Sequence, residues 1–354
     1  MNLFFLNNSV YQIYLARELM FQYQIEPDDC TLVLRLTENH TSTLRTSPRS
    51  KPEILKIVDW NNIFFLGSRK SNSFFKRITN ALDYEKKCLE IFHSYPKVGK
   101  VIFGNYGNES MRNLANKLIR LNVEVFFLDE GIGTLHLYQS REKNATGTLK
   151  KSMFYSLKYL FTSRLKDMIF KLKTGDVRGR VHFFTEYKLD STDKTQIITN
   201  EYNYFKKLIE NTVKTNESYF VGTPYVNKGR IALNTYIDII KSFKNLNASA
   251  KIKYIPHPRE DSAILKDELS ALDIEILNIS TPIEIYLMNL KQVPAHIGGF
   301  TSTSLHTIYS LFSHSCNFTI FKLPDAVINK NERFIFNYFK NEKKGSNFNF
   351  IESV

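Results

Sequence analysis

The order of apolar and polar residues in the first half of the chain predicts strands and helices in alternation. Short apolar runs have the length of buried strands at residues 1–6, 31–36, 100–104 and 123–128. A helix is predicted over residues 10–23, and a second helix, before the last of these strands, carries an apolar stripe of Met111, Leu114, Leu118 and Leu121. A strand, a helix and a strand within about thirty residues are typical of a right-handed parallel crossover.

The second half of the chain repeats this pattern. A strand and a loop are predicted at residues 218–226, and further strands at 251–258, 273–277, 294–299 and 317–323. Helices are predicted at residues 232–243, 282–290 and 301–312. The fold class that we predict is therefore α/β, with two Rossmann-like parallel-sheet domains.

The length of the chain also favours two domains, because 354 residues exceed what one ordinary core organises. Loop-like sequence between residues 175 and 195 contains the predicted boundary, which divides the chain into residues 1–185 and 186–354. Ligands of such sheets bind beyond the carboxyl ends of the strands. We therefore expect a ligand cleft between the two domains.

Composition excludes several classes of protein. Hydrophobic residues make up 43% of the chain, but no run of about 18 apolar residues predicts a membrane-spanning helix. The N-terminus lacks the basic start and small-residue cleavage site of a signal peptide. The three cysteines, Cys30, Cys88 and Cys316, are far apart, which favours a reducing compartment, and no Cys/His cluster has zinc spacing. A cytoplasmic protein is expected.

The formal charge of +13 suits a partner such as nucleic acid, anionic lipid or a phosphorylated ligand, and the alternative is a proteome that is basic in general. Residues 141–180 hold 11 Lys and Arg against 3 Asp and Glu, interleaved with aromatic and aliphatic residues. This basic segment is typical of a peripheral contact with an anionic membrane, and equally of solvated helices packed on a core. A homodimer is compatible with this composition, whereas no recognised nucleic-acid-binding motif accompanies the charge.

Two adjacent acids, Asp129 and Glu130, follow the predicted strand at residues 123–128. A carboxylate at this place suits a general base, a metal ligand or a ligand of a ribose. Adjacent carboxylates repel each other, which raises one pKa towards neutrality. Gly131 and Gly133 allow the backbone to bend and approach a ligand. The alternative is a pair of acids at a helix N-terminus, where they favour the helix dipole.

Polar residues also follow predicted strands of the second half. His257 lies between Pro256 and Pro258, which stiffen the backbone, and Arg259 adds charge beside it. An imidazole held in this way can donate to a phosphate or act as an acid, although a single histidine is often structural.

Two helix starts complete the set of candidate residues. Ser302, Thr303 and Ser304 open the predicted helix at 301–312, where hydroxyls and backbone N–H groups bind phosphate or simply cap the helix. Glu284 lies near the start of the helix at 282–290, as a ribose ligand or as an acid that favours the helix dipole. Together, the four stretches describe a nucleotide-sugar site.

Their order along the chain resembles the bacterial lipooligosaccharide sialyltransferase family. The stretch "DEGIGT" at residues 129–134 is similar to the family's "DDGTGN"-like motif, and "PHPR" at residues 256–259 is present as in the family. The Ser/Thr cluster at residues 302–304 follows in the same order. The similarity extends over most of the chain.

This resemblance implies an inverting, metal-independent glycosyltransferase of the GT-B architecture. It implies CMP-N-acetylneuraminic acid as the donor, a galactose-terminated glycan of a bacterial surface lipooligosaccharide or polysaccharide as the acceptor, and no cofactor. The implied catalytic residues are Asp129 as the base and His257 as the phosphate contact and acid. The implied donor-binding residues are Glu130, Gly131, Gly133, Pro258, Glu284, Ser302, Thr303 and Ser304.

One position departs from the family. Some relatives have an aspartate base after a "GSP"-like turn, and the matching stretch here places Tyr225 at that position. Since the ordinary pKa of tyrosine is about 10, Tyr225 is no base at neutral pH, and Asp129, with Glu130 as the runner-up, takes that role in our prediction. Two other functions compete with this one: a GT-B enzyme for another nucleotide sugar, and a non-catalytic protein that binds nucleic acid or another polyanion.

Overall fold

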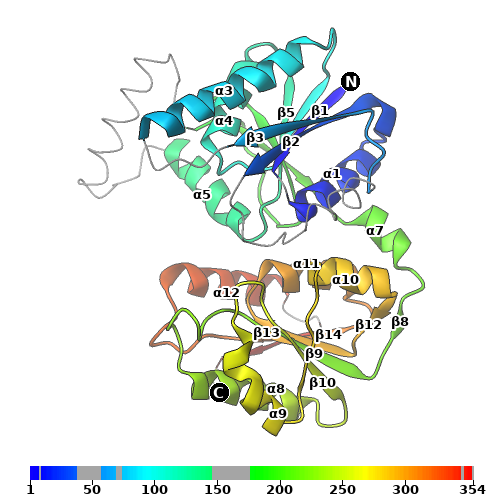
Figure 1. Cartoon of the computed structure of the whole chain (residues 1–354), viewed down its shortest axis with the longest axis vertical. Helices are drawn as coiled ribbons and strands as arrows, with labels where there is room; N and C mark the ends of the chain where they lie inside the picture. The colour runs from blue at the N-terminus through cyan, green and yellow to red at the C-terminus, as the bar shows by residue number, and fades with distance from the viewer. Residues whose placement is uncertain (8, 38–56, 69–73, 146–175, 344–346, 353–354) are drawn as a thin grey trace. The chain divides into compact units, whose positions relative to one another are not determined.

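A computed structural model describes residues 1–7, 9–37, 57–68, 74–145, 176–343 and 347–352. The chain divides into two compact units, residues 1–204 and 205–354 (Figure 1). Most of the basic segment, residues 146–175, lies outside the described residues. In the described part of the chain, no helix is long and apolar enough to cross a membrane.

The first unit is a seven-stranded sheet in which every strand pair is parallel. Its order is β3-β2-β1-β4-β5-β6-β7, which begins with the 3-2-1-4-5-6 order of doubly wound nucleotide-binding sheets. The strands are β1 (Asn2–Asn7), β2 (Cys30–Thr37), β3 (Asn62–Ser68), β4 (Lys100–Phe103), β5 (Glu124–Leu128), β6 (Val181–Thr185) and β7 (Thr195–Thr199). The helices are α1 (Val10–Gln22), the 3₁₀ turn η1 (Pro27–Asp29), α3 (Phe74–His93), α4 (Glu109–Ile119) and α5 (Gly133–Ala145).

Alternate residues of these strands face two different helix layers, as a period of two requires. Phe5 and Phe127 pack towards α3 and α4 in one core cluster, whereas Phe126 on the opposite face contacts Tyr23 at the end of α1. The predicted stripe on α4 is buried at Met111, Leu114 and Leu118. Leu121 is 53% exposed, because the helix ends at Ile119 before reaching it.

The second unit holds a six-stranded parallel sheet in the order β11-β10-β9-β13-β14-β15. When the six strands of this sheet are numbered by their order in the chain, the sheet order is again 3-2-1-4-5-6. The strands are β9 (Glu217–Val221), β10 (Lys251–Ile255), β11 (Glu275–Ile276), β13 (His296–Phe300), β14 (Asn317–Phe321) and β15 (Phe348–Ile351), with a separate pair of β8 (Val213–Lys214) and β12 (Gln292–Val293). The helix α7 (Asn203–Leu208) spans the boundary between the units. The helices that follow are α8 (Leu233–Leu246), the 3₁₀ turn η2 (Ser262–Leu265), α9 (Lys266–Ala271), α10 (Ile283–Leu290), α11 (Thr303–Phe312) and α12 (Lys330–Glu342). Figure 1 shows α8 and α9 on one face of this sheet and α10 and α11 on the other.

The two sheets confirm the predicted α/β fold class with Rossmann-like parallel sheets. The boundary between the units differs from the predicted one after residue 185. Residues 186–204 belong to the first unit, because β7 pairs in parallel with β6 as the last strand of the first sheet. All three cysteines are free and buried.

The two glycines of "HIGGF" lie inside β13, whereas the sequence analysis placed them at the end of that strand. A Cβ on Gly298 would lie 2.3 Å from the ring of Phe243, and a Cβ on Gly299 would lie 2.7 Å from the backbone oxygen of Val221. These glycines therefore permit the close packing of β13 against β9 and α8. They are not themselves part of a phosphate-binding turn.

Candidate active site

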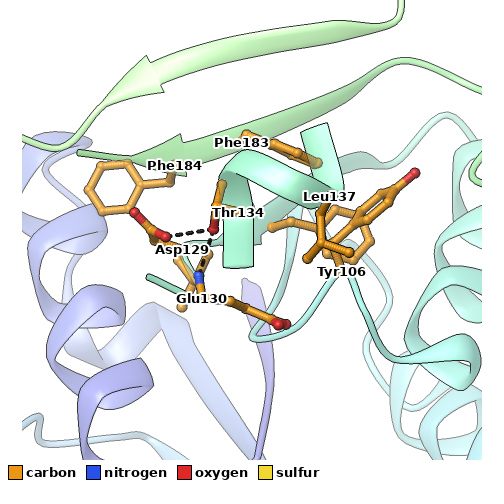
Figure 2. Close-up of a pocket in the computed structure, with 9 residues that line it drawn as sticks. Tyr106, Asp129, Glu130, Thr134, Leu137, Phe183 and Phe184 are labelled. Atoms are coloured by element: carbon orange, nitrogen blue, oxygen red, sulfur yellow. Dashed lines mark hydrogen bonds between the residues drawn. The ribbon is translucent and has the colours of Figure 1, made fainter. Parts of the chain in front are cut away.

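The predicted acid pair lies at the carboxyl edge of the first sheet, directly after β5. Asp129 is 1% exposed, and Glu130 is partly exposed. Figure 2 shows their carboxylates pointing in different directions. Gly131 has a φ of 65°, which a residue without a Cβ adopts at little cost, and so turns the chain into α5.

Asp129 is held by hydrogen bonds from two neighbouring elements. The Thr134 hydroxyl donates to Oδ1 at 2.6 Å and itself accepts from the Glu130 N–H at 2.8 Å (Figure 2). The Thr185 hydroxyl, from the end of β6, donates to Oδ2 at 2.7 Å, and the Glu186 N–H donates to the same oxygen at 3.3 Å. These partners are mainly threonine side chains, so Asp129 does not act as the helix cap of the alternative prediction.

Burial, helped by the charge of Glu186 and opposed by the hydrogen bonds to the carboxylate, raises the pKa of Asp129 to about 7. Burial also raises the pKa of Glu130 to about 7, with Asp129 adding to the shift. Tyr11, at the start of α1, lies in the field of Asp129 and Glu186, and its hydroxyl lies 3.2 Å from that of Tyr202. A carboxyl group with a pKa near 7 suits proton transfer at neutral pH.

These raised pKa values predict how stability depends on pH. A carboxyl group with a raised pKa in the folded state stabilises the fold fully below its unfolded pKa of about 4, and this contribution is lost as the pH rises through about 7. We expect the free energy of unfolding to fall between about pH 4 and pH 7, and the fall to be ~2–4 kcal/mol smaller in Asp129→Asn. Urea unfolding, followed by circular dichroism, measures the free energy of unfolding at each pH. Equal pH slopes in the wild type and in Asp129→Asn would contradict the prediction.

A small cavity lies beside the acid pair, between α5 and the ends of β5 and β6. It is lined by aromatic residues such as Tyr106 and Phe183 together with Asp129, Glu130 and Thr134 (Figure 2). The cavity has room for about one water molecule. A sugar or nucleotide does not fit there, so the cavity belongs to the interior of the unit.

Arg141, the first residue of the predicted basic segment, is structural. It is 2% exposed and donates to the backbone oxygens of Val177, Gly179 and Lys194 at 2.6–2.9 Å. Its guanidinium therefore fixes α5 to the chain before β6 and β7, and it does not contribute to a basic surface.

In the second unit, strand register aligns the predicted residues along one sheet edge. Val221 of β9 pairs with Ile255 of β10 and with Gly299 of β13. The residues two positions further, Thr223, His257 and Thr301, therefore follow three neighbouring strands at the carboxyl edge. The strand order changes direction between β9 and β13, and ligands of such sheets bind at this point.

His257 is partly exposed, and its Nδ1 accepts the Arg259 N–H at 3.0 Å. In the neutral ring this leaves the proton on Nε2, which can donate to a ligand. Burial, with help from the charges of Arg259 and Lys228, lowers the pKa of His257 to about 4. The ring is thus a neutral hydrogen-bond donor at pH 7 before an anion binds.

The Ser/Thr cluster starts α11 at the same edge. Ser302 is the N-cap, and its Oγ accepts the Leu305 N–H at 3.2 Å, so the capping alternative describes this hydroxyl. Thr303 and Ser304 are partly exposed in the first turn, where helix N–H groups favour anions. Glu284 is 8% exposed in the first turn of α10, which packs beside α11.

Tyr225 packs on the core of its unit. Its ring lies 5.2 Å from the ring of Phe300 and 5.4 Å from the Arg230 guanidinium. Burial raises its pKa to about 12, and the charge of Glu332 adds to the shift. A phenol with this pKa stays protonated at neutral pH, as the sequence analysis predicted.

The sequence analysis missed several residues of the site. Thr134, Thr185 and Glu186 surround Asp129, and Glu260 accepts the His257 N–H at 3.0 Å. Glu260 directly follows the quoted stretch "PHPR", so an acid three residues after the histidine was an available signal. Across the part of the chain that the structure describes, no three His, Cys, Asp or Glu side chains cluster to hold a metal ion.

Comparison with known proteins identifies a family and solved structures with the same fold. The family model described as alpha-2,8-polysialyltransferase (POLYST) matches residues 2–316. None of the curated proteins matches the sequence significantly.

Among solved structures, the UDP-GlcNAc 2-epimerase from Methanocaldococcus jannaschii aligns with a TM-score of 0.56 at 11% identity, over 99% of this chain and 89% of that one. A UDP-glucosyltransferase from Polygonum tinctorium aligns with a TM-score of 0.54 at 8% identity, over 97% and 83%. A sialyltransferase from Photobacterium damsela aligns with a TM-score of 0.49 at 10% identity, over 99% and 81%, which is too weak to support a conclusion. At these identities the first two structures show the fold that they share with this chain.

Proposed function

Because the chain belongs to the alpha-2,8-polysialyltransferase family, whose model matches residues 2–316, we propose that it transfers N-acetylneuraminic acid from CMP-N-acetylneuraminic acid to a glycan hydroxyl. The family match carries this proposal. The resemblance to sialyltransferases seen in the sequence is thereby confirmed at the level of the family. The donor, the stereochemistry and the acceptor are the proposed parts.

The proposed acceptor is a glycan that already ends in sialic acid. An α2,8 linkage joins the second carbon of one sialic acid to the eighth oxygen of another, so the family description favours this acceptor over the galactose end that the sequence resemblance implied. The glycan hydroxyl attacks the second carbon of the donor sugar, the bond from that carbon to the phosphate oxygen breaks, and CMP leaves with the electron pair. Attack from the face opposite the phosphate inverts the configuration.

We propose that the carboxylate of Asp129 accepts the proton of the attacking glycan hydroxyl. Its pKa of about 7 suits a base near neutral pH. Asp129 is only 1% exposed, but it accepts the N–H of Glu186, which is partly exposed and whose charge raises the pKa of Asp129. We propose that Glu186, through its N–H and its charge, links the buried Asp129 to the surface of the unit.

In this proposal, His257 and the start of α11 bind the phosphate of the departing CMP. The Nε2–H of His257 donates to a phosphate oxygen, and Thr303 and Ser304 lie in the first helix turn, which favours anions. Glu284 is the proposed ribose ligand. A single phosphate requires few donors, so we propose a reaction without a metal ion.

The test is incubation with CMP-N-acetylneuraminic acid and three acceptors: lactose, α2,3-sialyllactose and an α2,8-linked disialyl-lactose. We expect a ladder of added sialyl residues on the disialyl acceptor, detected by mass spectrometry. Product on lactose alone would support sialyl transfer but would contradict the proposed acceptor, and it would favour a glycan that ends in galactose. No product on any acceptor, with thermal stabilisation by UDP and none by CMP, would reject the donor and favour another nucleotide sugar.

A further inference from the structure

A buried chain of hydrogen bonds lies behind His257. The Thr223 N–H donates to the Tyr236 hydroxyl at 3.0 Å, the hydroxyls of Tyr236 and Tyr254 lie 2.9 Å apart, and the Tyr254 hydroxyl donates to Glu260 at 2.7 Å. The other Glu260 carboxylate oxygen accepts the backbone N–H of His257 at 3.0 Å. The chain thus connects the end of β9, through α8 and β10, to the loop that carries the imidazole.

When Glu260 is ionised and accepts, the number of protons sets the direction of these bonds. Since the single proton of Tyr254 goes to Glu260, the proton of Tyr236 goes to Tyr254, and the oxygen of Tyr236 accepts from Thr223. All the donors therefore point towards one carboxylate. Aligned hydrogen bonds in a buried site strengthen one another, and Tyr236 and Tyr254 are both 0% exposed.

Gly222 leaves the space that this arrangement needs. A Cβ at this position would lie 2.3 Å from the Tyr254 hydroxyl and 2.5 Å from Oε2 of Glu260. Any side chain at position 222 would displace the two groups that hold the histidine loop. The glycine after β9 is therefore explained by the carboxylate that it accommodates.

Glu260 also holds the loop at its other end, because its own N–H donates to the His257 carbonyl at 2.8 Å. The turn from His257 to Glu260 is closed by both backbone groups of the histidine. Within this turn the Arg259 N–H donates to Nδ1 of the imidazole. The same turn thus fixes the backbone, the ring orientation and the tautomer of His257.

We propose that Glu260 is the positioning residue of His257, and that the Tyr236–Tyr254 pair couples it to the end of β9. The carboxylate fixes the turn so that the Nε2–H of His257 faces the donor phosphate. This inference rests on the proposed function for the identity of the ligand. It assigns to Glu260 no contact with the donor itself.

The test combines a binding measurement with a spectroscopic one. The probe is cytidine 5′-(methyl phosphate), a phosphodiester that has no ionisation near pH 7, titrated calorimetrically into the full chain. We expect Glu260→Gln to weaken binding about tenfold, and to have no further effect in a His257→Ala background. Nitrogen NMR of labelled histidine is expected to show the Nε2–H tautomer of His257 in the wild type and a mixture of tautomers in Glu260→Gln.

Glu268→Gln, an exposed glutamate of α9 in the same unit, is the matched control and should change neither signal. Additive losses in the double variant, or an unchanged tautomer in Glu260→Gln, would overturn the positioning role. If the wild type fails to bind the probe, the proposed donor is wrong, whereas the tautomer measurement still decides the role of Glu260. If Glu260→Gln folds poorly, Tyr254→Phe takes its place in the test. This variant removes one hydrogen-bond donor to Glu260 and retains the ring, so smaller changes in probe binding and in the His257 tautomer are expected.

Discussion

Asp129→Asn is expected to lower kcat for sialyl transfer by about 10²–10⁴-fold, the usual size of general-base catalysis, while donor binding changes little. The amide keeps the shape of the carboxyl group and cannot take a proton. In the wild type, kcat should rise with pH through about 7 as Asp129 ionises. Steady-state kinetics across this range, with CMP-N-acetylneuraminic acid as the donor, measure both effects.

The comparison among neighbouring acids decides which one is the base. Glu130→Gln and Glu186→Gln remove the two partly exposed carboxyl groups nearby, and Asp193→Asn changes an exposed aspartate of the same unit as a control. Asp129→Asn at the wild-type rate, with a large loss in Glu130→Gln, would move the base to Glu130. If Asp129 and Glu186 act as a pair, the double variant loses no more than Asp129→Asn alone.

Periodicity was sufficient to predict the strands that are fully buried and the helices with one apolar face. The run at residues 123–128 became β5, and the segment at 282–290 became α10, within one residue at each end. The predicted boundary after residue 185 was misplaced because one more strand of the first sheet follows it. This strand, β7, pairs with β6 and so belongs to the first unit. A sequence pattern does not show to which sheet an edge strand is added.

The motif residues were found from the sequence because each follows a predicted strand, and the structure places Asp129 and His257 at such carboxyl edges. Several further residues of the site were not found, because they come from other elements of the fold. Thr185 reaches Asp129 across 56 positions and Tyr254 reaches Glu260 across 6, and neither spacing follows from a helix or strand period. The burial that raises the pKa of Asp129 is likewise a property of the assembled unit.

His257→Ala is expected to lower kcat by about 10²–10³-fold, the typical effect of removing one donor to a developing negative charge. The phosphate gains charge as the bond to the sugar breaks, so the Nε2–H stabilises the transition state more than the bound donor. The fold should survive, because the hydrogen bond that the structure describes for this ring is the one from the Arg259 N–H. Kinetics and thermal unfolding of the purified variant measure the two effects separately.

The protonation state of His257 separates a hydrogen-bond donor from a proton donor. With a pKa of about 4, the free ring is neutral at pH 7, so a role as a neutral donor predicts that His257→Asn, which retains an N–H, restores part of the rate. A role as an acid instead predicts that His257→Asn is as slow as His257→Ala. His314→Ala, an exposed histidine of the same unit, should keep the wild-type rate, and a wild-type rate in His257→Ala would remove this residue from the reaction.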